Sequence, residues 1–102
     1  MSDDVLDDTL LEPVETLGRH ESRRVLYALL FVSDSPVSAV RLSEALGDME
    51  ADVVTALLEE LRVELNSHEE IPYELREIAG GYQLVTKAEF APYIRRFFRI
   101  KK

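Results

Sequence analysis

Histidines and neighbouring glutamates are the residues of this sequence whose types could support acid–base or metal chemistry. His20 lies at the start of an expected helix and His68 in an expected loop, and neither has a second ligand at metal-site spacing. Glutamates are paired at positions 59–60 and 69–70, but adjacent residues of a helix do not face one another. The sequence contains no cysteine, which excludes thiol nucleophiles and thiolate metal sites. We therefore predict a protein that is not an enzyme and uses neither cofactor nor metal.

The elements that must position these side chains belong to one small domain. A chain of 102 residues that is 46% hydrophobic has the size and composition of a single globular core. Its longest apolar run, residues 25–32, is far shorter than the ~20 residues that a bilayer requires. The N-terminus is acidic, whereas a secretory signal would begin with basic residues. These features predict a cytoplasmic protein without a membrane contact.

The net charge of −8 is distributed unevenly along the chain. Residues 1–16 contain six acidic residues and no basic one, whereas residues 87–102 contain six basic residues and one acidic residue. The first of these segments predicts that residues 1–18 are a disordered acidic leader preceding a domain at residues 19–102. Leucine and valine recur there at helical spacing, which leaves open a short segment that docks on a partner.

Apolar periodicity predicts three helices in the first two thirds of the chain. The first spans residues 19–33 with an apolar face that includes Phe31, and it ends before Pro36. The second is short, carries Val40 on its apolar face, begins after a Ser38 cap and ends at Gly47. The third spans residues 50–66. Its predicted apolar stripe consists of Val53, Val54, Leu57, Leu58, Leu61 and Leu65.

The period then changes from helical to alternating. Residues 73–78 and 82–86 form two alternating runs around Gly80 and Gly81, which predicts a β-hairpin whose turn uses the positive φ that glycine allows. Strands on both sides make Gly80-Gly81 a turn rather than a phosphate-binding loop. A T-x-x-E capping box at residues 86–89 and a helix from Pro92 to Arg99 follow. The fold class is mainly α with a β-hairpin, a winged helix-turn-helix.

A winged helix suggests DNA binding, but the charges of the expected recognition helix oppose it. Residues 50–66 contain five acidic residues and a single arginine, and the tip of the hairpin carries no basic residue. We therefore predict that direct DNA binding through this motif is weak or absent. The basic C-terminal segment, with Arg95, Arg96 and Arg99, is the one candidate nucleic-acid contact. It supports an alternative function, a winged-helix DNA-binding transcriptional regulator.

Aromatic residues are concentrated in the hairpin and the last helix. They could be core residues of a small domain, or part of an interface in which aromatic side chains are favoured. The second interpretation predicts a partner or dimer interface formed by Tyr73, Tyr82, Phe90, Tyr93, Phe97 and Phe98.

Four segments of the sequence form a recognisable pattern: residues 28–33 (ALLFVS), 35–38 (SPVS), 42–47 (LSEALG) and, most specifically, 73–96. The last contains the signature Leu-Arg-Glu-x-Ala-Gly-Gly-Tyr-x-Leu-Val-Thr. Together these segments resemble the segregation and condensation protein B (ScpB) family, and the resemblance extends over about residues 23–96.

The resemblance implies a non-enzymatic subunit of the bacterial condensin, acting in chromosome condensation and segregation during cell division. In that family a ScpB homodimer binds the kleisin ScpA, and through it the SMC ATPase, at the nucleoid in the cytoplasm. Family members usually contain two tandem winged-helix domains. The first is associated with dimerisation and the second with much of the kleisin contact. We expect residues 19–102 to be the first of these domains, with the second absent from this chain.

Overall fold

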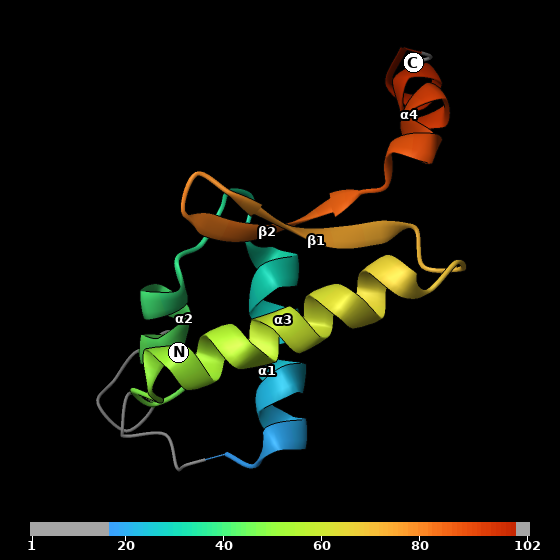
Figure 1. Ribbon diagram of the computed structural model, residues 1–102. Coiled ribbons are helices and arrows are strands. Elements are labelled where there is room, and N and C mark those ends of the chain that lie inside the picture. The colour runs from blue at the N-terminus through green and yellow to red at the C-terminus, as the bar shows by residue number, and fades with distance from the viewer. Residues whose placement is uncertain (1–16, 100–102) are drawn as a thin grey trace, which may run out of the picture.

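The computed structural model describes residues 17–99. In chain order the elements are α1 (Arg19–Val32), α2 (Ala39–Ala45), α3 (Ala51–Ser67), β1 (Tyr73–Ile78), β2 (Gly81–Thr86), the 3-10 turn η2 (Ala88–Phe90) and α4 (Ala91–Arg99). The predicted order of three helices, a hairpin and a last helix is confirmed. The hairpin lies against the helical body, whereas α4 stands apart beyond the end of β2 (Figure 1). The predicted leader falls almost entirely on residues 1–16, outside the described residues.

The core is formed almost entirely by leucine and valine. Its buried side chains come from α1, the α2 region, α3 and the wing: Leu26, Leu30, Val37, Leu42, Leu46, Val54, Leu57, Leu58, Leu61, Leu65 and Leu75. The predicted apolar faces were too wide in three places, because Phe31, Val40 and Val53 are exposed. Each helix packs only one side on the core, and residues adjacent in a helix differ by about 100° in direction. Val53 therefore points outward where Val54 is buried.

Local signals set the ends of α2 as predicted. The backbone N–H of Arg41 donates to Ser38 Oγ at 3.1 Å, which is the expected N-terminal cap. After the helix, Gly47 adopts a φ of 79° and Asp48 a φ of 62°, so the chain reverses through left-handed backbone. Ser43 Oγ also donates to the carbonyl of Met49, which fastens the turn between α2 and α3.

The predicted capping box at residues 86–89 is wrong. Thr86 is the last residue of β2 and pairs with Tyr73, so Lys87 takes the cap position of η2, without a side-chain capping bond. Strand pairing keeps the backbone extended through Thr86, whereas the capping box would have begun a helical turn at this residue. The N–H of Lys87 donates to the carbonyl of Pro72 at 2.8 Å, which continues the ladder past the strand end.

The wing is an antiparallel hairpin whose register runs from Tyr73 opposite Thr86 to Ile78 opposite Gly81. Its turn residues are Ala79, with a φ of 51°, and Gly80, with a φ of 81°. The expectation that both glycines form the turn is therefore corrected. Gly81 begins β2, and a Cβ there would lie 2.9 Å from Cβ of Pro36. Glycine is needed at this position because another segment of backbone passes close to it.

Candidate protein-interaction surface

The first part of the candidate site is the aromatic face of α4. Tyr93 and Phe97 are each 71% exposed and Phe98 is 68% exposed, and none of residues Ala91–Arg99 is buried. The rings of Phe97 and Phe98 meet edge to face, with centroids 5.1 Å apart. Residues 93, 94, 97 and 98 share one side of the helix, because 93 and 97 and likewise 94 and 98 are four apart and 94 and 97 are three apart. The described part of the chain leaves this apolar face uncovered.

The predicted aromatic residues of the wing have different surroundings. Tyr73 on β1 is 43% exposed, whereas Tyr82 on β2 is partly buried against the core. Burial raises the pKa of the Tyr82 hydroxyl, with the carboxylate of Glu77 adding to the shift. Phe90 is partly buried in η2. The structure thus brings Tyr93, Phe97 and Phe98 together on α4 and places the other three aromatic residues outside that face.

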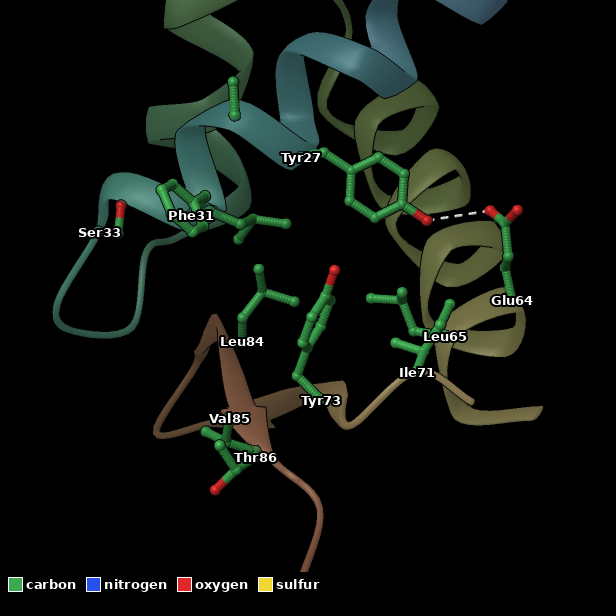
Figure 2. A pocket seen from close by; sticks show the side chains of 12 residues that line it. Tyr27, Phe31, Ser33, Glu64, Leu65, Ile71, Tyr73, Leu84, Val85 and Thr86 are labelled. Carbon is green, nitrogen blue, oxygen red and sulfur yellow. Dashed lines mark hydrogen bonds between the residues drawn. The ribbon is translucent and has the colours of Figure 1, made fainter. Parts of the chain in front are cut away.

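The second part of the candidate site is a groove of about 660 Å³ beside the wing. It lies between the last turns of α1, the end of α3 and the strands of the hairpin (Figure 2). Phe31, which is 81% exposed, lies at its edge beside the end of α1, whereas Tyr73 stands between Leu84 and Leu65 (Figure 2). The lining residues are Tyr27, Ala28, Leu30, Phe31, Ser33, Glu64, Leu65, Ile71, Tyr73, Leu84, Val85 and Thr86.

The predicted interface residues include Tyr73 but not Phe31, Tyr27 or Ile71, which also line the groove. Phe31 was assigned to an apolar helix face because it continues an apolar run. The exposure of part of this run could have been inferred from its width, since a helix buries only a single stripe against one neighbour.

One wall of the groove is fixed by hydrogen bonds between α1 and α3. Tyr27 Oη donates to Glu64 Oε1 at 2.9 Å, and Arg23 donates to the same carboxylate oxygen. These donors lower the pKa of Glu64, and the hydrogen bond from Tyr27 is the largest single cause. Burial, and then the bond to Glu64, raises the pKa of Tyr27 to about 12. Glu64 is therefore ionised at neutral pH and holds the Tyr27 ring at the groove wall.

The acidic surface of α3 is partly neutralised by arginines of α1 and of α3 itself. Glu60 pairs with Arg19 at 2.5 Å and with Arg23 at 3.3 Å, while Glu59 pairs with Arg62 at 2.5 Å. The single arginine of α3 thus faces a carboxylate of its own helix. Since these pairs are at or near the surface, they contribute little to stability. They do confirm that this helix presents carboxylates rather than cations.

The predicted nucleic-acid residues Arg95, Arg96 and Arg99 are exposed on α4. Within residues 17–99 none of the three forms an ion pair. Helical geometry places Arg95 and Arg96 on the two flanks of the aromatic face and Arg99 opposite it. Cations near the end of a helix also stabilise its dipole.

The side chains first considered for chemistry are dispersed. His20 and His68 are both exposed, and the described residues include no group of three potential metal ligands. No helix among residues 17–99 is long and apolar enough to cross a membrane.

These features define a winged-helix domain with an acidic recognition helix, an exposed aromatic helix and an apolar groove. Such surfaces are typical of a domain that binds other proteins. A family model described as segregation and condensation complex subunit ScpB matches residues 24–102. The chain therefore belongs to the ScpB family.

Individual relatives agree with this assignment. The chain is 43% identical to segregation and condensation protein B of Moorella thermoacetica over 77 residues, which are 76% of this chain and 38% of the relative. It is 35% identical to the protein of the same name from Desulforamulus reducens over 86 residues, covering 81% of this chain and 45% of the relative. The chain thus spans less than half the length of these relatives.

Solved structures show the same fold. ScpB from Mycobacterium tuberculosis matches with a TM-score of 0.77 and 34% identity over 83% of this chain and 52% of that protein. A dimer of a ScpB N-terminal domain complexed with a ScpA peptide matches with a TM-score of 0.70 and 29% identity. That match covers 76% of this chain and 95% of the solved domain.

Proposed function

We propose that this chain is a non-enzymatic subunit of a bacterial SMC–kleisin complex that acts in chromosome condensation and segregation. In this proposal residues 19–102 are the first of two winged-helix domains, and they form a homodimer that contacts a kleisin of the ScpA type. The complex would operate in the cytoplasm, at the nucleoid. The observation that carries the proposal is the similarity to nearly the whole of a ScpB N-terminal domain, whose solved form is a dimer with a ScpA peptide.

The exposed surfaces of the chain support a role in protein contacts. Large aromatic side chains on a surface mark interfaces, because burying each one removes a large apolar area from water. Tyr73, Tyr93, Phe97 and Phe98 are exposed, and we assign them to the interface, with Tyr82 and Phe90 supporting them from partly buried positions.

Light scattering during size-exclusion chromatography tests self-association. The 11.7 kDa chain should elute as a dimer whose fraction rises with protein concentration. Co-purification with the tagged kleisin from the same genome tests the second part, and we expect a complex containing two copies of the chain. A chain that remains monomeric at high concentration and is not retained by the kleisin would contradict the proposal.

A further inference from the structure

Helix α4 is an amphipathic helix without a covering partner in its own chain. It has nine residues, and isolated helices of this length are only marginally stable in water. Tyr93, Phe97 and Phe98 would remain in contact with water if α4 stayed as it is in the single chain. A helix with this composition therefore requires an apolar surface to pack against.

The attachment of α4 directs it away from its own groove. Lys87 is fixed by its N–H bond to Pro72 and by a bond from its Nζ to the carbonyl of His68, both 2.8 Å long. Phe90 then closes η2 by donating its N–H to the carbonyl of Lys87 at 3.0 Å. This anchored turn leads directly into α4, which extends beyond the end of the wing (Figure 1).

The groove beside the wing has the size and chemistry to receive such a helix face. Its volume of about 660 Å³ lies within the range of clefts that bury compact apolar ligands. Phe31 and Tyr73 offer aromatic surface to it, and Leu84 forms part of its lining. All three side chains keep area exposed to solvent in the single chain.

Charge complementarity selects α4 as the occupant. Glu64 lines the groove, and two further carboxylates belong to sequence neighbours of its lining residues, because Asp34 follows Ser33 and Glu70 precedes Ile71. Within residues 17–99 neither Asp34 nor Glu70 forms an ion pair. Arg95 and Arg96 flank the aromatic face of α4 and are equally without partners there. A basic aromatic helix thus suits an apolar groove with these carboxylates better than an acidic peptide does.

We propose that α4 of one copy packs its aromatic face into the groove of a second copy, and that the second copy returns its own α4 in the same way. This inference rests on the proposed function, because it assigns a mode to the self-association. Reciprocal exchange produces a closed two-fold dimer with two identical helix-in-groove contacts. It explains why the same chain carries both an exposed aromatic helix face and an apolar groove.

Disulfide trapping tests the exchange, since the sequence contains no cysteine of its own. Phe31→Cys and Phe97→Cys variants of the full chain, carrying tags of different size, are mixed at high concentration and oxidised. Both positions are exposed, so the fold of each chain should survive. We expect a covalent heterodimer containing one chain of each variant. Phe97→Cys mixed with Val53→Cys, an exposed position on α3 outside the groove, is the control and should give at least tenfold less product.

Three results would overturn the exchange. If light scattering gives a dimer but Phe97→Cys links no better to Phe31→Cys than to Val53→Cys, the dimer forms in another way and the proposed function stands. If a Phe31→Cys/Phe97→Cys double variant closes a disulfide within one monomer, α4 covers its own groove. If Phe31→Cys links to a kleisin carrying a cysteine and not to Phe97→Cys, the groove belongs to the kleisin.

Discussion

Tyr27 and Glu64 make one of the side-chain contacts that join α1 to α3. We expect Tyr27→Phe to lower the free energy of unfolding at pH 7 by about 1–2 kcal/mol, because it removes a hydrogen bond to a charged acceptor and leaves the ring in place. Urea denaturation followed by circular dichroism measures the change. Tyr73→Phe is the matched control, since the Tyr73 hydroxyl forms no hydrogen bond within residues 17–99, and it should change stability by less than about 0.5 kcal/mol.

The same bond has a defined pH dependence. The pKa of Glu64 is lowered in the folded state, so its contribution is present above the ordinary carboxyl pKa and is lost as pH falls through the lowered value. The pKa of Tyr27 is raised to about 12, so the hydroxyl contribution is complete below about pH 10 and is lost as pH rises toward 12. The stability difference between wild type and Tyr27→Phe should therefore shrink below pH 4. A difference that is equally large at pH 3 would contradict the role of the Glu64 carboxylate.

Single residues were predictable from sequence where their role is local. Ser38 and Gly47 act on backbone within a few residues of themselves, so their types alone indicate a cap and a reversal. The contribution of Phe31 to the groove was not predictable, because it depends on where the wing lies relative to α1. The groove as a whole was not predictable for the same reason, since its lining comes from α1, α3 and both strands of the hairpin.

At the scale of elements, the wing is joined to the helical body through the segment before α2. Val37 and Tyr82 exchange backbone hydrogen bonds of 2.9 and 2.8 Å, which makes Val37 a one-residue third strand. Gly81 lies beside this bridge, with the backbone of Pro36 and Val37 3.0 Å from the position of a Cβ. The sequence identified the glycine but not its purpose, because Pro36 is far away along the chain.

Gly81→Ala should therefore destabilise the fold. The added methyl group must displace backbone rather than a flexible side chain, so we expect a loss of about 1–3 kcal/mol in the free energy of unfolding. Urea denaturation measures it, with Gly18→Ser as control. Gly18 has open space around its Cβ position and precedes α1, where serine is a favourable cap, so this variant should be neutral or slightly stabilising. If both variants unfold at the same urea concentration as wild type, the close approach is not a constraint on the wing.

At the scale of the whole molecule, the exposed surfaces of α3 and α4 differ in charge, and α3 is the acidic one. The chain has 20 acidic and 12 basic residues, and α3, which would enter a DNA groove, carries carboxylates along its exposed side. The acidic character of α3 could be predicted from the sequence, because it depends on the residue types and not on how the chain folds. The position of α4 could not, since periodicity predicts a helix but does not determine which surface it covers.

The alternative function as a DNA-binding regulator depends on that charge distribution. The three arginines of α4 are exposed and form no ion pair within residues 17–99, and three phosphate contacts give a logarithmic salt slope of at most about −2.7. We therefore expect no shift of duplex DNA at physiological salt, and at low salt only weak binding that is lost in the Arg95→Glu/Arg96→Glu/Arg99→Glu variant. Fluorescence anisotropy with a labelled duplex across a salt series measures both.

The outcome also bears on the dimer, because Arg95 and Arg96 cannot neutralise phosphates while they face the carboxylates of a second copy. DNA affinity at low salt should then fall as the concentration of dimer rises, although the number of arginines present increases. Binding that survives the triple substitution, or a salt slope steeper than about −3, would require cations outside α4 and would favour the regulator.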